Sequence, residues 1–502
     1  MKPISTGSDW DFALIERYEN EIGQCAAEFG LDTYPNQIEI ITSEQMLDAY
    51  SSTGLPTGYQ HWSYGKEFIA NEQAYRKGRQ GLAYEIVINS DPCIAYLMEE
   101  NSMMMQALVI AHASFGHNSF FKGNFLFRQW TQADAILDYL VFARRYVMDC
   151  EERHGVTAVE DMLDSCHALM DYGVHRYQRP APLSPKAEKA RGDERRELAR
   201  LQYNDLWRTV PVATVAPNVR EPAQHGKHAS FPAEHEENIL WFVEKYSPRL
   251  EPWQREIVRI VRKIAQYFYP QGQTKVMNEG WATFWHYTLI NRLYDKGLVT
   301  DGFMIEFLQS HTNVVSQRGF DQPGYGGINP YALGFSMMQD LRRICEKPEA
   351  EDRRWFPEIA GADWLKVLDF AMRNFKDESF IAQYLSPRLI RDFHLFAVAD
   401  HQQQPTLAID SIHDDDGYKR VRQLLSEQHK RDNLVPDIQV ARFDKEGDRS
   451  LTLVHQMQRD RPLAQGEAGE VLKHLERLWG FDVRLETVRE DGRIDESLAY
   501  AA

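Results

Sequence analysis

One stretch places a carboxylate and an imidazole seven residues apart in an otherwise apolar and aromatic segment: Asn278-Glu279-Gly280-Trp281-Ala282-Thr283-Phe284-Trp285-His286-Tyr287. On an α-helix seven residues make two turns to within about 20°, so Glu279 and His286 lie on one stripe. Ala282 and Thr283 lie between them and are small, which leaves room beside the stripe. The pattern indicates the wall of a site, although an isolated Glu–His pair more often satisfies itself within a core.

Length and composition are those of an acidic globular protein. The chain has 502 residues, 43% hydrophobic and 26% charged, which is enough for two or three domains. A net charge of −17 argues against binding to nucleic acid or to anionic membranes. The sequence starts without the apolar run of a signal peptide and contains no stretch that would span a bilayer. Five scattered cysteines without a C-x-x-C motif predict reduced, buried thiols in a cytoplasmic protein.

Helical periodicity dominates the first 394 residues. Apolar residues recur at helical spacing in several segments: 9–30, 131–153, 156–171 and 237–268. Tyr269-Pro270-Gln271-Gly272 is predicted to end the last of these helices.

Two further regions complete the predicted organisation. Residues 180–222 are rich in proline and charge, which indicates an insertion within one domain. After residue 395, short strand patterns alternate with helical segments at 416–429 and 466–479. We therefore predict a mainly α fold with a small β component over 1–394, into which a zincin-like helical core would fit, and a small α+β domain over 395–502.

A strand and two helices are predicted around a pair of histidines. Residues 82–89 are rich in aromatic and β-branched residues and form the clearest strand pattern. Asp91-Pro92 fits an N-cap followed by proline at the first helical position, so a short helix is predicted to begin there, and Asn329-Pro330 carries the same signal. A further apolar helix is predicted to end with His112 and His117.

The spacing of these histidines argues against a simple helical metal pair. His112 and His117 are five residues apart, which is about 140° of rotation on an ideal α-helix. The zinc motif H-E-x-x-H uses a separation of four, which places both rings on one face. A π-bulge, or local unwinding at Gly116, would bring His112 and His117 together, and π-bulges are frequent at functional sites.

A strand, a helix with two histidines and a later helix with a carboxylate resemble the arrangement of gluzincin metallopeptidases. That resemblance implies a divalent metal such as zinc, bound by His112, His117 and Glu279, and a strand that binds substrate. It fails at Ala113, where those peptidases carry the glutamate that activates water. Hydrolysis would then need another base, such as Glu279, His286 or a carboxylate from elsewhere in the chain.

Several long motifs, in order, resemble the SpoVR family, named for stage V sporulation protein R. They lie at 84–93, 111–122, 274–282, 329–331 and 380–387, and so extend over nearly the whole chain. The resemblance implies a cytoplasmic protein linked to spore-cortex assembly in spore formers. In other bacteria it implies a role in stress or stationary-phase programmes, beside a serine protein kinase and a companion protein. It implies no established reaction.

Two hypotheses follow for the function. The first is a metal-dependent, hydrolase-like domain that acts on a peptide or amide substrate. In this hypothesis His112, His117 and Glu279 bind the metal, and Glu279 and His286 are the catalytic groups. His286 also serves as a fourth ligand or as a hydrogen-bond partner of a ligand. The second is a non-catalytic regulatory or assembly protein that acts with the serine protein kinase, in which these side chains form a buried hydrogen-bond network. Ala113 and the histidine spacing favour the second.

Overall fold

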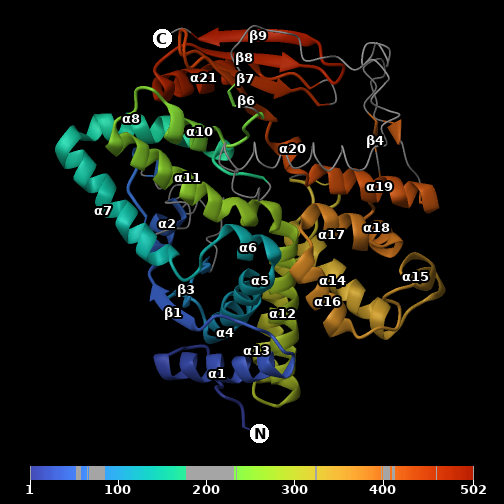
Figure 1. Cartoon of the computed structure of the whole chain (residues 1–502). Helices are drawn as coiled ribbons and strands as arrows, with labels where there is room; N and C mark the ends of the chain where they lie inside the picture. Colours follow the sequence, from blue (N-terminus) through green and yellow to red (C-terminus); the bar gives the residue numbers. More distant parts are fainter. Residues whose placement is uncertain are drawn as a thin grey trace, which may run out of the picture.

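The molecule is mainly helical, and its described residues also form a three-stranded sheet, a four-stranded sheet at another level and a short two-stranded pair (Figure 1). This confirms the predicted fold class. The computed structural model describes most of the chain: residues 2–51, 58–64, 66, 85–176, 231–232, 234–320, 322, 325–396, 398–399, 408–409, 413–458 and 461–500. The predicted insertion at 180–222 lies outside these residues.

The first sheet has the strand order β1-β3-β2, formed by β1 (Asn36–Ile41), β3 (Cys93–Met98) and β2 (Glu85–Ile88). β1 runs parallel to β3, and β2 runs antiparallel to it with Glu85 opposite Leu97. The predicted strand at 82–89 is confirmed over 85–88, and residues 82–84 lie outside the described residues. Within the described residues β2 forms an edge of this sheet, and it carries Glu85 at one end.

The helix predicted to begin at Asp91-Pro92 is wrong, because the strand β3 follows there instead. Every residue of β3 is paired with β1 on one side, and most are paired with β2 on the other. Two neighbouring strands satisfy the backbone groups of this short apolar run, so tertiary pairing overrides the local capping signal. The same signal is confirmed at Asn329, whose side chain accepts from the Tyr331 amide at the start of α14 (Pro330–Glu346).

The helix α12 (Lys275–Asp295) contains the stretch quoted at the outset and passes through the first hydrophobic core. It packs against the π-helix η1 (Ile110–His117) on one side and against α14 on another. A Cβ atom on Gly280 would lie 2.4 Å from the Cα atom of Gly334 in α14. Glycine at both positions therefore allows the two helix backbones to touch.

Shorter helices surround α12 and complete the first core (Figure 1). These helices are α1 (Phe12–Glu28), α4 (Met103–Val109), α5 (Asn118–Gly123), α6 (Phe125–Trp130), α13 (Asp301–Val314), α15 (Ala350–Trp355), α16 (Trp364–Asn374), α17 (Asp377–Tyr384), α18 (Pro387–Asp392) and α19 (Asp415–Gln428). Two further helices contribute nothing to this core: α2 (Ser43–Ser51), which packs with the first sheet in a small core of its own, and α20 (Arg431–Leu434). The side chains of α12 that face this core are apolar and buried, and the largest of them are the aromatic residues Trp281, Phe284 and Trp285.

A second core joins helices from the middle of the chain to the C-terminal sheet. Its helices are α7 (Ile136–His154), α8 (Val156–His167), the 3-10 turn η2 (Met170–Tyr172), α10 (Ile239–Tyr246), α11 (Pro252–Gln273) and α21 (Gln465–Trp479). The predicted break at Tyr269-Pro270 is wrong, because α11 continues through Pro270 to Gln273. Only Thr274 separates α11 from α12, so the helix ends a turn later than the proline signal indicates.

The C-terminal sheet has the order β6-β7-β8-β9 and lies at the end of the molecule opposite the N terminus (Figure 1). Its strands are β6 (Ile438–Phe443), β7 (Leu451–Gln456), β8 (Val483–Val488) and β9 (Ile494–Tyr500). A short antiparallel pair, β4 (Val398–Ala399) and β5 (Ala408–Ile409), precedes α19. The α+β pattern predicted for the last hundred residues is therefore confirmed, and β9 is an additional strand.

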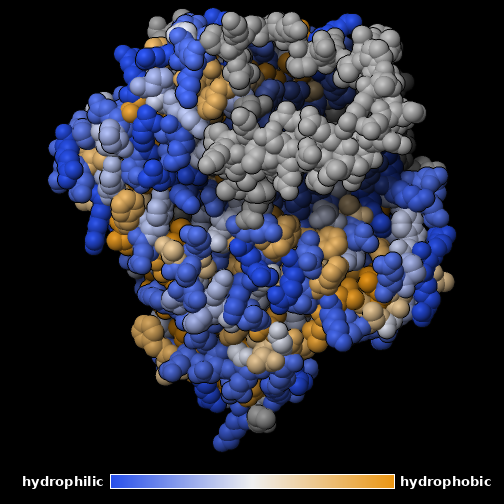
Figure 2. Space-filling view, in the orientation of Figure 1, coloured by the Kyte–Doolittle hydropathy of each residue, from blue (hydrophilic) through white to orange (hydrophobic). Residues whose placement is uncertain are grey.

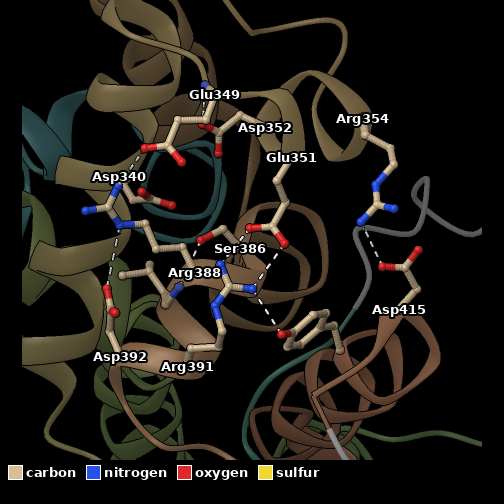
Figure 3. Close-up of polar contacts among 12 residues, drawn as sticks. Asp340, Glu349, Glu351, Asp352, Arg354, Ser386, Arg388, Arg391, Asp392 and Asp415 are labelled. Atoms are coloured by element: carbon tan, nitrogen blue, oxygen red, sulfur yellow. Dashed lines mark hydrogen bonds and ion pairs between the residues drawn. The ribbon is translucent and has the colours of Figure 1, made fainter.

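Ion pairs hold α15 against α18 and α19 (Figure 3). Arg391 of α18 contacts Glu351 at 2.7 Å and donates a hydrogen bond to the Tyr418 hydroxyl. Arg354 contacts Asp415 at 2.9 Å. These groups are partly exposed, so each pair contributes well under about 1 kcal/mol and mainly fixes orientation.

Hydrophilic residues cover most of the face drawn in Figure 2, with hydrophobic residues in small groups between them. Among the described residues, no helix is both long and apolar enough to cross a bilayer. All five cysteines are buried and unpaired, as predicted.

Candidate metal centre

Four ionisable side chains from three elements converge beside α12. The Nε2 atom of His112 lies 3.2 Å from Oε1 of Glu85 and 3.8 Å from Oε2 of Glu279. The Nε2 atom of His117 lies 3.9 Å and 3.5 Å from the same two oxygens. Glu85 comes from β2, the histidines from η1 and Glu279 from α12. The three predicted ligands therefore lie together, and Glu85 joins them.

The π-helix removes the difficulty of the histidine spacing. Residues 110–117 form η1, in which hydrogen bonds connect residues five apart, so His112 and His117 face the same side. Their ring centroids are 4.7 Å apart with the planes nearly perpendicular, at 86°. The π-bulge considered from the sequence is thus confirmed.

Close packing against α12 fixes the position of η1. A Cβ atom on Gly116 would lie 2.6 Å from the Cα atom of Ala282. The room that Ala282 leaves on the α12 stripe is therefore filled by the η1 backbone. This contact holds His117 next to Glu279, because Gly116 and Ala282 each lie within three residues of one of these side chains.

The second nitrogen of each of these two histidines is also hydrogen-bonded. His117 donates from Nδ1 to Oδ1 of Asn278 over 2.9 Å, which leaves the lone pair on Nε2 facing the carboxylates. The Nδ1 atom of His112 lies 2.9 Å from Nδ1 of His286. Among the described contacts, His286 is connected to the carboxylates through His112, and its predicted catalytic or ligand role stays a prediction.

Burial and mutual attraction set the protonation of the four groups. Burial raises the pKa of Glu85 to about 7, against the attraction of His112. Burial lowers the pKa of His117 to about 4. For His112 and Glu279 burial opposes charge, yet the opposite charges around them prevail. The pKa of His112 is therefore raised and that of Glu279 is lowered.

The spacing of the donors fits a small divalent cation. Four ligands at 2.0–2.1 Å from a tetrahedral zinc ion are about 3.3–3.4 Å apart. The four separations between a histidine Nε2 atom and a carboxylate oxygen range from 3.2 to 3.9 Å, close to this value. Oε2 of Glu279 and Oε2 of Glu85 are buried without a hydrogen-bond partner. A buried carboxylate oxygen without a partner is costly, and a cation at this point would relieve that cost for Oε2 of Glu279, the oxygen that faces both histidines.

Glu85 is the site residue that the sequence did not single out. Within the described residues it belongs to the group of acidic and histidine side chains spaced for a metal ion, together with His112 and His117. A carboxylate in an otherwise apolar strand pattern was the available signal.

Asp377 was missed as well. Both of its oxygens accept backbone amides at the start of α12, from Val276 and Met277, each over 2.8 Å. It anchors the helix two residues before Glu279. No local pattern reveals this role, since Asp377 is about a hundred residues away along the chain.

Comparison with known proteins agrees with the motif resemblance. The sequence model of the family described as SpoVR like protein matches residues 9–434, and that of the SpoVR-like C-terminal domain matches residues 436–490. A protein of Escherichia coli (strain K12), described as uncharacterized protein YcgB, is 58% identical over 492 residues, which cover 98% of this chain and 95% of that protein. No solved structure matches the chain. The chain therefore belongs to the SpoVR family.

Proposed function

We propose that this protein is a metal-dependent hydrolase acting on a peptide or amide bond, with His112, His117 and Glu279 as ligands of a divalent cation of the zinc type. The observation that carries the proposal is that the Nε2 atoms of His112 and His117 each lie 3.2–3.9 Å from one carboxylate oxygen of Glu85 and one of Glu279. When bound, such a cation supplies Lewis-acid polarisation of a substrate carbonyl.

Glu85 supplies the base that Ala113 does not. Its Oε1 atom faces His112 and His117, while Oε2 is buried and has no hydrogen-bond partner. In the proposed reaction Oε2 accepts a proton from the attacking water and delivers it to the leaving amine. His117 is held by Asn278, and His112 by His286, with Nε2 of each directed at the carboxylates.

The alternative is a regulatory or assembly protein that acts with a serine protein kinase. One observation favours it: with Glu85 as a fourth ligand, all four donors come from the chain, as in closed structural zinc sites. The two proposals therefore differ in the role of Glu85.

Metal content and cleavage distinguish these proposals. Untagged protein is analysed for bound metals and, after chelation, titrated with Zn²⁺. We expect about one equivalent for the native chain and for the exposed control Glu358→Gln, and a large loss of affinity for Glu279→Gln. Native protein that binds no divalent cation would refute the metal centre.

Glu85→Gln decides the role of the second carboxylate. If the protein is a hydrolase, the Glu85→Gln variant still binds zinc but no longer cleaves a peptide library that the native protein cleaves. In the structural alternative Glu85→Gln loses zinc, and the native protein cleaves nothing.

A further inference from the structure

Three buried histidines form a chain that leads away from the centre. His112 of η1 contacts His286 of α12 through the two Nδ1 atoms, 2.9 Å apart. Nε2 of His286 then contacts Nδ1 of His311 in α13, again over 2.9 Å. His286 and His311 are 1% and 5% exposed. This row of hydrogen-bonded histidines thus connects His112, a proposed ligand, to His311, which has no contact with Glu85 or Glu279 among the described interactions.

The surroundings keep the outer two rings neutral. The ring of His311 is enclosed by Tyr287, Phe307 and Phe335, with centroids 4.8–5.9 Å from its own. Both rings are buried, and among the described interactions neither contacts a carboxylate, so a positive charge on either ring would have no compensating partner. Each of these neutral rings carries one N–H, so each is a donor at one nitrogen and an acceptor at the other.

Only two arrangements of protons satisfy both hydrogen bonds when all three rings are neutral. In the first, His112 donates from Nδ1 to His286, and His286 donates from Nε2 to His311. In the second, both bonds are reversed, and His112 carries its proton on Nε2, facing Oε1 of Glu85 at 3.2 Å. The three rings must therefore change tautomer together.

We infer that His286 and His311 form a tautomer relay that selects which nitrogen of His112 is free to bind the cation. Only the first arrangement leaves a lone pair on Nε2 of His112. Loading of the cation therefore fixes the proton of His311 on Nε2, two residues away from the ligand along the hydrogen-bond chain. His286 and His311 are positioning residues. The inference rests on the proposed metal centre. It adds the expectation that cation binding changes the tautomer of His311 in α13.

The test uses the full chain with Zn²⁺ as the probe. Nitrogen-15 spectra of the histidine rings, recorded with and without Zn²⁺ at an alkaline pH where His112 is neutral in the metal-free protein, report the tautomer of each ring. We expect His311 to change from the Nδ1–H to the Nε2–H form when Zn²⁺ is added, with no change in its charge. A His311 tautomer that is the same in both spectra would overturn the relay, even where Zn²⁺ binds.

Variants give an independent measurement. His311→Phe keeps a ring but removes the nitrogen that contacts His286, and we expect Zn²⁺ affinity to fall about 10–100-fold. His311→Asn retains a polar atom near the Nδ1 position and should restore most of that affinity. His474→Phe is the control, because this histidine bonds Ser165 in the second core. Unchanged affinity in His311→Phe would overturn the inference, whereas native protein that binds no Zn²⁺ would refute the proposed function itself.

Discussion

Replacing Gly116 by alanine tests the link between packing and the proposed metal centre. The added Cβ atom would lie 2.6 Å from the Cα atom and 2.9 Å from the Cβ atom of Ala282, where ordinary contact begins at 3.4 Å. Both atoms belong to tightly held helices, so η1 and α12 must separate by about 0.8 Å. Overpacking of this kind costs about 1–3 kcal/mol, partly offset by about 1 kcal/mol from the better helix propensity of alanine.

The same displacement moves His117 away from Glu279. Metal sites tolerate errors of only about 0.2 Å in ligand distance, so Zn²⁺ affinity should fall at least about tenfold. Chemical denaturation and competition with a fluorescent chelator measure the two effects. The matched control is Gly272→Ala in α11, where a Cβ atom meets nothing within 4 Å, and we expect it to be neutral or stabilising without any change in affinity. Gly116→Ala with native stability and native affinity would refute the packing argument.

Three further predictions concern the supports of the site and of the fold. Asn278→Leu removes the acceptor for Nδ1 of His117 and should weaken Zn²⁺ binding about tenfold, whereas Asn278→Asp retains an acceptor and should keep the native affinity. Equal Zn²⁺ affinities for the native protein and both variants would contradict this prediction. Burial raises the pKa of Asp377 to about 7 from 3.8, so its stabilising contribution is complete below about pH 4 and lost as pH rises through 7. Asp377→Asn should therefore remove this part of the pH dependence of the unfolding free energy, and an unaltered profile would count against it. Arg343→Met leaves two buried carboxylates, Asp340 and Asp352, without the guanidinium that bonds them, and should lower the free energy of unfolding in urea by about 3 kcal/mol. Arg373→Met breaks a more exposed ion pair with Asp369 and should lower it far less.

Local patterns were reliable where they depended on one segment. The long amphipathic helices, the strand at 85–88 and the start of α14 follow from periodicity and capping, which act over a few residues. The failures occurred where a partner distant in sequence decided the outcome. Asp91-Pro92 precedes a strand because β1 and β2 pair with it, and Pro270 stays helical within the packed α11.

The sequence by itself determined the fold class, the family and three of the four side chains at the centre. His112, His117 and Glu279 were identifiable because histidines and a carboxylate are uncommon within apolar helical segments. Only the tertiary structure decided that residues 110–117 wind as a π-helix, that Glu85 completes the group and that His286 lies behind His112. The physical reason is that these features depend on contacts between β2, η1, α12 and α13. Such contacts are governed by packing distances between backbones, such as that of Gly116 with Ala282, which a local pattern does not encode.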